Sequence, residues 1–197
     1  MAEIKSALEL ALERTEDVEV DRESLKKHEI QQEGKKIVSK FLQDLSKDSI
    51  KEDLKGFSGK ERKWAVEGAM NVLLANLILP KGDTLDVNLT RLKEACKDLL
   101  KDNERIEYIF KQIEQFFSRY LEDKNSVKEQ LLQQYGPRLE EKRRQLAQQT
   151  GQQINLPPEA DPEFAQILQK NMAHLDSQYQ EVVGQIRDEI KDMPKKI

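Results

Sequence analysis

The sequence predicts an all-α protein, with a helical bundle core followed by a long C-terminal helical hairpin with coiled-coil-like packing. Three observations carry this prediction. Only 8 Gly and 6 Pro occur in 197 residues, too few for the many turns of an all-β or doubly wound fold. Good helix formers such as Glu, Lys, Leu, Gln and Ala dominate the composition. Charged residues make up 36% of the chain and hydrophobic residues 37%, which fits long, partly solvated helices better than a compact enzyme.

Residues 1–15 are predicted to form an amphipathic helix, because their apolar residues recur every three or four positions. Residues 16–21 are mostly acidic, so we expect a linker there. A tethered helix of this length is marginal alone and needs a surface to bind. Its partner is either the chain's own core or another protein, and the candidate interface residues are Ile4, Leu8 and Leu12.

Residues 22–121 are predicted to form the helical core. Its first helix contains Gly34, which weakens a helix by roughly 1 kcal/mol relative to Ala. A short helix follows over residues 49–55. Ser58 and Glu61 then have the spacing of a capping box. The helix that they open is apolar on all sides, so we expect it in the middle of the core.

The course of the chain over residues 104–150 has two readings. An aromatic-rich stripe runs from Ile106 to Leu121. Beyond it the helix either continues, or breaks near Asp123 and restarts on a second capping box at residues 126–129. Gly136-Pro137 must kink or interrupt it. The sequence leaves open whether this stretch is one kinked helix or two.

Residues 122–197 are predicted to form the C-terminal hairpin. Asp161-Pro162-Glu163 is a typical helix start, with a capping carboxylate, a proline at the first position and an acid in the first turn. The apolar residues of this last helix alternate in steps of 4 and 3, a heptad-like seam that requires one partner helix. That partner lies in the same chain or in a second copy. The candidate interface residues are Leu168, Met172, Leu175, Tyr179, Val182 and Ile186.

The residue types that carry site chemistry do not form a recognisable site. The two histidines, His28 and His174, fall on different predicted helices, and neither has a His or Cys at ligand spacing. Cys96 falls on an apolar helix face and is interpreted as a small core residue. The chain contains neither the dinucleotide-binding fingerprint nor the phosphate-loop pattern. We therefore predict no catalytic residue, no metal, no cofactor and no small-molecule substrate.

Two polar groups have alternative interpretations. Glu67 and Asn71 lie one turn apart on the most apolar helix. They form either a satisfied hydrogen-bonded pair or a spot that faces a ligand. The four basic residues within positions 138–144 are offset by Glu140 and Glu141. With a net charge of -4 over the whole chain, we expect neither nucleic acid nor an anionic membrane as partner.

The location of the protein is predicted from what its sequence contains. The first residues have no basic stretch followed by an apolar run, so we expect no signal peptide. The most apolar stretch, Trp64 to Leu79, is too short and too polar to cross a bilayer. A single cysteine excludes an internal disulfide framework. We therefore expect a cytoplasmic protein without membrane insertion.

The predicted first and last helices of the chain resemble those of a known group of proteins. Glu3 to Thr15, EIKSALELALERT, resembles the opening helix of a group of uncharacterised bacterial all-helical proteins of about this length. Asp161 to Phe164 and Leu175 to Tyr179 are similar to the C-terminal helix of that group. The resemblance implies a bacterial cytoplasmic protein, and it implies no activity, cofactor or functional residue.

We expect a non-catalytic protein-protein interaction function, as an adaptor or scaffold whose partner is another protein or a second copy of this chain. The contact surface is predicted to be the N-terminal helix or the C-terminal hairpin. A chaperone-like holder of client proteins is the first alternative, and a wide exposed apolar stripe on the hairpin would favour it. The second is an enzyme with a site near Glu67 and Asn71, for which a deep pocket would argue.

Overall fold

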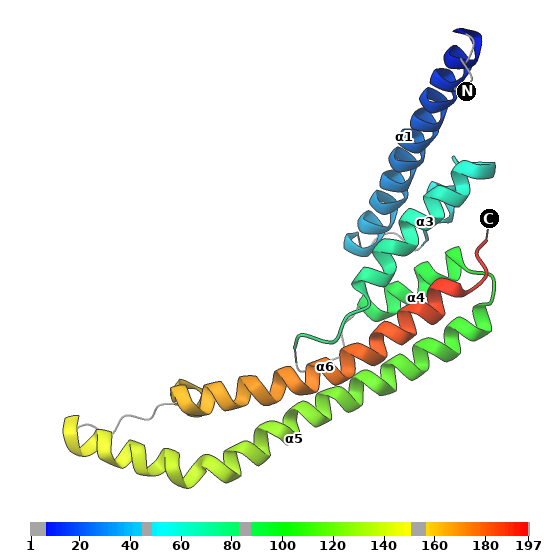
Figure 1. Cartoon of the computed structure of the whole chain (residues 1–197). Coiled ribbons are helices and arrows are strands. Elements are labelled where there is room, and N and C mark those ends of the chain that lie inside the picture. The colour runs from blue at the N-terminus through cyan, green and yellow to red at the C-terminus, as the bar shows by residue number, and fades with distance from the viewer. Residues whose placement is uncertain (1–6, 45–48, 83–87, 151–156, 197) are drawn as a thin grey trace, which may run out of the picture. The chain divides into compact units, whose positions relative to one another are not determined.

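The structure is a computed structural model that describes residues 7–44, 49–82, 88–150 and 157–196 (Figure 1). Within these ranges the chain forms six α-helices and one turn of 3-10 helix, and contains no β-strand. The prediction of an all-α fold is confirmed. None of the described helices combines the length with the apolar character that crossing a membrane requires.

The chain divides into two compact units. Unit 1 contains residues 1–77, 90–106 and 191–197, and unit 2 contains residues 78–89 and 107–190. These units do not follow the predicted boundary between a core over residues 22–121 and a hairpin over residues 122–197, because that boundary falls inside one long helix, α5 (Asn103–Thr150). The hairpin therefore includes the aromatic-rich stripe that the sequence analysis assigned to the core.

Helix α1 runs without a break from Ala7 to Gln43. The predicted helix boundary after residue 15 and the acidic linker over residues 16–21 are therefore wrong. Repulsion between like charges one turn apart costs only a few tenths of a kcal/mol per pair. Once the packed C-terminal half of α1 has nucleated the helix, each further residue adds a hydrogen bond at little cost. Propagation therefore outweighs the repulsion.

Helix α1 crosses α3 (Gly59–Asn76) through two glycines. A Cβ atom added at Gly34 would lie less than 3.0 Å from the carbonyl carbon of Ala65. One added at Gly68 would lie equally close to the carbonyl of Gln31. The two backbones are therefore in direct contact. Gly34, which the sequence analysis counted only as a weak point, is required by this close approach.

The burial of side chains follows from this crossing. In α1 the buried hydrophobic residues are Ile30, Val38 and Phe41, all in its C-terminal half. In α3 the buried hydrophobic residues are Ala65, Val66, Ala69, Met70 and Leu73, which at 100° per residue lie within about 140° of one another. Lys63, Asn71 and Ala75 on the other side are exposed, so α3 buries one wide face and is not enclosed on all sides as predicted.

Short elements complete unit 1. The predicted helix over residues 49–55 is present as α2 (Lys51–Leu54), and Asp98 on α4 (Asn88–Leu99) accepts hydrogen bonds from the Ser49 hydroxyl at 2.7 Å and from the Ile50 amide at 2.9 Å. Ser58 is the N-cap residue of α3, but its side chain makes no capping hydrogen bond. The Glu61 carboxylate pairs with Lys26 of α1 at 2.6 Å, so the predicted capping box is not formed.

The C-terminal residues of the described chain pair with the segment after α4. The Lys101 amide donates to the Pro194 carbonyl at 2.9 Å, and the Lys196 amide donates to the Leu99 carbonyl at 2.7 Å. The Lys196 carbonyl in turn accepts a hydrogen bond from the Arg62 guanidinium at 3.5 Å. These contacts fix the end of the chain to unit 1.

Two long helices dominate unit 2. Helix α5 continues through Gly136 and Pro137 as a single helix, which answers the question that the sequence left open. A 3-10 turn, Pro158–Ala160, precedes α6 (Pro162–Asp192). Asp161 caps α6 as predicted, because its carboxylate accepts hydrogen bonds from the amides of Glu163 and Phe164 at 3.1 and 3.0 Å. Helix α6 lies along α5 (Figure 1).

Candidate protein-interaction surfaces

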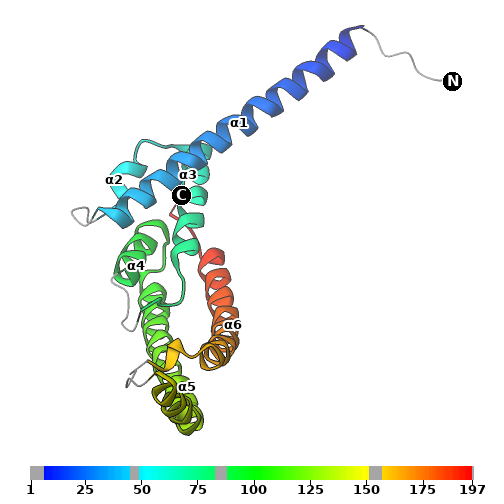
Figure 2. The same ribbon diagram turned by 90° about the vertical axis from the view of Figure 1, so that its left-hand side faces the viewer.

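The N-terminal part of α1 is the first candidate surface. Residues 22–29 are all exposed, and the Leu25 side chain is 58% exposed. Two ion pairs join α1 to the beginning of α3: Glu23 with Lys60 at 3.1 Å, and Lys26 with Glu61 at 2.6 Å. N-terminal to these pairs the helix continues to Ala7, and Figure 2 shows this stretch extending beyond the other helices of unit 1.

The interface residues predicted for the N-terminal helix fall on this stretch in part. Leu8 and Leu12 belong to the described backbone of α1. Ile4 lies outside the described residues. The structure therefore places two of the three predicted residues on a helix that runs beyond the part of α1 packed on α3.

The seam of α6 is the second candidate surface, and α5 of the same chain covers much of it. The six predicted residues are half-buried: Leu168, Met172, Leu175, Tyr179, Val182 and Ile186. The Tyr179 ring lies 4.8 Å from the Phe116 ring and 5.1 Å from the Tyr120 ring, measured between centroids. Leu168 packs against a cluster around Phe164, which is fully buried. The intramolecular pairing that the sequence analysis weighed against a homodimer is therefore formed.

Two tyrosine–aspartate hydrogen bonds join α5 and α6 in the middle of the hairpin. The Tyr120 hydroxyl on α5 donates to Asp176 on α6 at 2.7 Å. The Tyr179 hydroxyl on α6 donates to Asp123 on α5 at 2.6 Å. Each helix thus contributes one donor and one acceptor, three residues apart. Between the two hydrogen bonds the tyrosine rings themselves are in contact, with centroids 5.1 Å apart and ring planes tilted by 58°.

Burial and these hydrogen bonds raise the pKa of both tyrosines. Burial raises the pKa of Tyr120 well above its usual range, and the hydrogen bond to Asp176 raises it further. Burial and the hydrogen bond to Asp123 raise the pKa of Tyr179 to about 12. Both effects disfavour the phenolate, since a buried charge loses hydration and a neighbouring carboxylate repels it. The two hydroxyls therefore stay protonated donors near neutral pH.

The reciprocal pair was not predicted, although its signal is visible in the sequence. Tyr120 to Asp123 has the pattern Tyr-x-x-Asp, and Asp176 to Tyr179 has the pattern Asp-x-x-Tyr. In the antiparallel hairpin the two rings meet, and each hydroxyl reaches the carboxylate three residues from the other tyrosine. The apolar periodicity of the seam does not show these polar partners.

The basic cluster at residues 138–144 is largely engaged with acids of the same unit. Lys142 pairs with Asp161 at 2.8 Å and with Glu163 at 3.0 Å. Arg138 pairs with Glu163 at 2.8 Å. The hydrogen bond from Lys142 lowers the pKa of Asp161, and the two carboxylates raise the pKa of Lys142. These pairs fix the 3-10 turn and the start of α6 to α5, which is a structural role.

The residues considered for enzyme chemistry are not gathered into a site. Glu67 is half-buried and accepts a hydrogen bond from Gln31 at 3.3 Å, while Asn71 is exposed. Cys96 is 2% exposed, and burial raises the pKa of its thiol to about 12, so the thiol is a core group. His28 and His174 are exposed. Among the described residues, no group of three His, Cys, Asp or Glu is placed to hold a metal ion.

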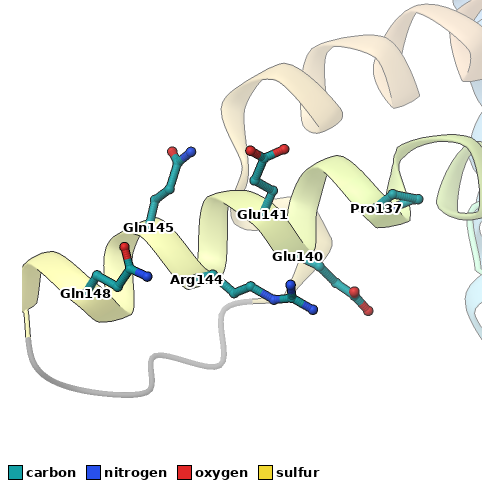
Figure 3. A pocket seen from close by; sticks show the side chains of 6 residues that line it. All are labelled: Pro137, Glu140, Glu141, Arg144, Gln145 and Gln148. Atoms are coloured by element: carbon teal, nitrogen blue, oxygen red, sulfur yellow. The ribbon is translucent and has the colours of Figure 1, made fainter.

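Three hollows on the surface of unit 2 could in principle hold a ligand. One of about 510 Å³ lies on α5 beside Pro137, and Figure 3 shows that all six of its lining residues belong to that single helix. Glu141 and Gln145 point to one side of the helix, and Glu140 and Arg144 point to the other (Figure 3). These side chains do not converge on one point, so the hollow offers no set of groups to hold a ligand.

The other two hollows lie between elements of unit 2. One of about 260 Å³ is walled mainly by Leu139, Leu146 and the prolines around the 3-10 turn. One of about 560 Å³ lies between residues 78–81 and the middle of the hairpin. Two of its polar lining residues, Tyr120 and Asp176, are already hydrogen-bonded to each other. In the described part of the chain, no buried side-chain nitrogen or oxygen lacks a hydrogen-bond partner. None of the three hollows is lined by Glu67 or Asn71.

Comparison with known proteins gives a family without an assigned activity. A search of curated proteins and a search of solved structures each found no match. The model of a family of unknown function, DUF6657, matches residues 51–192. The chain therefore belongs to the DUF6657 family.

Proposed function

We propose that this DUF6657 protein is a non-catalytic helical adaptor or scaffold that acts by binding proteins, and that the N-terminal part of α1 is its contact surface. The observation that carries the proposal is the exposure of α1 before its packed half. Residues 22–29 are exposed throughout, with the Leu25 side chain 58% exposed. We infer a cytoplasmic location and a bacterial origin from the sequence alone.

From Ala7 to residue 21 the helix measures about 22 Å, at 1.5 Å per residue. An isolated helix of this length is marginal in water, so this part of α1 depends on continuation from its packed half and gains stability from any surface that covers it. Leu8 and Leu12 lie one turn apart on it. A groove on a partner protein that covers an apolar face of this kind stabilises the helix and the complex together.

The hairpin is less suited than α1 to be the contact surface. The α6 seam is half-buried against α5, so less of its apolar surface is available to a partner. The large exposed hydrophobic side chains that the structure describes in unit 2 are Ile78, Tyr108 and Leu146, which are separated along the chain. A chaperone-like holder needs a continuous apolar stripe, and an enzyme near Glu67 needs a pocket. Neither alternative gains a specific supporting observation.

The test is cross-linking capture of partners from the native cells of the protein. The variant Leu8→Glu/Leu12→Glu places two charges on the proposed face, and the matched variant Leu10→Glu/Ser24→Glu places two charges on the opposite side of the helix. Circular dichroism verifies that both retain the helical content of the wild type. We expect specific partners with wild type and with the matched variant, and their loss with Leu8→Glu/Leu12→Glu. An identical set of partners for all three proteins would contradict the proposal.

A further inference from the structure

Helix α1 carries a heptad register before its packed half. Counting Leu8 as position a, the a positions are Leu8, Thr15 and Arg22. The d positions are Ala11, Val18 and Leu25. The steps along this stripe are 3, 4, 3, 4 and 3, which is the spacing of the seam of a coiled coil. The structure makes residues 7–43 one helix, so the register runs through the segment that the sequence analysis interrupted with a linker.

This stripe is not the face by which α1 packs on α3. The buried residues of α1 are Ile30, Gly34, Val38 and Phe41, and the contact with α3 is centred on Gly34, which faces Ala65. At 100° per residue, these positions lie about 120° around the helix from the a and d stripe. Leu25, the last d residue, is 58% exposed although the helix is already paired with α3 at Lys26. The packing within unit 1 therefore leaves the stripe uncovered where its side chains are described.

We propose that residues 7–26 of α1 form a parallel two-stranded coiled coil with the same segment of a second copy of this chain. The inference rests on the proposed function, since it names the partner of the surface assigned there. The occupant is identified by the charges beside the stripe. In a parallel pair, each g residue faces the e residue five positions later on the other helix.

In this arrangement, the charged residues that flank the stripe on one copy face residues of opposite charge on the other copy. Arg14 at g faces Glu19 of the second copy, and Asp21 at g faces Lys26 of the second copy. The third pair, Ala7 and Leu12, is apolar on both sides. All three g–e pairs are thus favourable, and the two-fold symmetry doubles each. An antiparallel pair instead brings e opposite e and g opposite g. Arg14 then still meets Asp21, but Glu19 meets the apolar Leu12 and loses its charged partner, so the parallel pair has more complementary charges.

The composition of the seam indicates a weak, reversible dimer. Thr15 and Arg22 at a positions and Ala11 at a d position bury little apolar surface. Polar residues at a positions lower stability but fix the register and the number of strands. Lys26 also pairs with Glu61 of its own chain, and its side chain remains 60% exposed and accessible to a second helix. The dimer is therefore expected to depend on concentration.

Sedimentation equilibrium of the full chain over a range of concentrations tests the proposal. We expect the mass to rise from 22.9 kDa toward twice that value. Glu19→Arg places two arginines opposite each other at two symmetric pairs, and should raise the dissociation constant about tenfold. Arg14→Glu/Glu19→Arg exchanges the charges and should restore wild-type association. The matched variant Glu13→Arg makes the same charge change at an outer f position and should have no effect.

A second measurement gives the orientation and does not depend on charge. Leu25→Cys alters an exposed residue, and the native Cys96 is buried and cannot react in the folded chain. In a parallel pair the two introduced thiols are adjacent, so mild oxidation should give a disulfide-linked dimer. Retention of helical content in each variant is verified by circular dichroism.

The outcomes separate this inference from the proposed function. A chain that stays monomeric at every concentration would overturn the coiled coil, while loss of partner capture in Leu8→Glu/Leu12→Glu would still support an adaptor. A dimer that is unaffected by Glu19→Arg, is not restored by the charge exchange, or is not cross-linked through Leu25→Cys would also overturn it.

Discussion

The α1–α3 crossing in unit 1 and the α5–α6 hairpin in unit 2 join helices in opposite ways. At the crossing, Gly34 and Gly68 let the two backbones touch. In the hairpin, rings meet across the helices, with Tyr120 and Tyr179 at 5.1 Å and Tyr135 and Phe164 at 6.3 Å. The first contact requires the absence of a side chain, and the second is made of large side chains.

The difference shows that helix pairs depend on the size of residues at their closest point. A crossing made by glycines tolerates no added atom, because the neighbour is backbone and cannot move aside. A hairpin made by aromatic residues loses stability when atoms are removed, because a cavity remains. We therefore expect larger side chains to destabilise the crossing, and smaller side chains to destabilise the hairpin.

Removing the buried ring of the hairpin should have the largest effect. Phe164 is fully buried in the cluster with Leu131 and Leu139. We expect Phe164→Ala to lower the free energy of unfolding by about 4 kcal/mol, through lost burial and the cavity left behind. Urea unfolding followed by circular dichroism measures it. A loss below about 1 kcal/mol, the size of a surface change, would contradict the packing described for this cluster.

Adding a methyl group at the crossing should have the next largest effect. Gly34→Ala or Gly68→Ala forces a Cβ atom into the carbonyl of the facing helix, and should destabilise unit 1 by about 3 kcal/mol. The matched control is Gly184→Ala in α6, where no atom lies within 4 Å of the added Cβ. There the better helix propensity of alanine should raise stability by about 1 kcal/mol. Equal effects at all three positions would remove the basis of the comparison.

The reciprocal hydrogen bonds of the hairpin should contribute less. Tyr179→Phe keeps the ring and removes the donor to Asp123. We expect the free energy of unfolding to fall by about 1 kcal/mol, the usual contribution of such a hydrogen bond. A double-mutant cycle with Asp123→Ala isolates the pair. Additive effects of the two substitutions would show that the hydrogen bond contributes nothing.

Alkaline pH should weaken the same contact, with no effect near neutrality. The pKa of Tyr179 is raised to about 12 in the folded chain, compared with 10.0 for an unperturbed tyrosine. The unfolded state therefore loses its proton first. The stabilisation is complete below about pH 10 and is lost as the pH rises toward about 12. Ultraviolet titration of tyrosinate should show two late-ionising tyrosines in the wild type, Tyr120 and Tyr179, and only Tyr120 in Tyr179→Phe. Titration at the usual pH in the wild type would contradict the burial of this hydroxyl.

The sequence predicts the elements with strong local signals. The all-α class, the helix start at Asp161 and the core position of Cys96 follow from composition, capping and periodicity. The false linker at residues 16–21 comes from judging acidic residues locally. Helix propagation from the packed half of α1 is a cooperative property that a short window of sequence does not show.

The closest contacts between helices could not be predicted from the sequence, because they depend on how the helices pack in three dimensions. That Gly34 faces Ala65, and Gly68 faces Gln31, depends on which turns of α1 and α3 cross. The partners of Tyr120 and Tyr179 depend in the same way on the register of α5 against α6. The candidate surface on α1 was visible in the spacing of Leu8 and Leu12. Its continuation to Leu25 became apparent only once the helix was shown to be unbroken.

Hydrogen exchange along α1 tests the central claim most directly, namely that its N-terminal part is uncovered in the single chain and is the contact surface. The measurement compares residues 8–21 with residues 30–41, first at a concentration where light scattering shows the monomer, then with the partner bound or at high concentration. We predict fast exchange of residues 8–21 in the monomer and marked protection on association, with residues 30–41 protected throughout. Equal protection of both segments in the monomer would show that the N-terminal part already docks within its own chain, and would contradict the account.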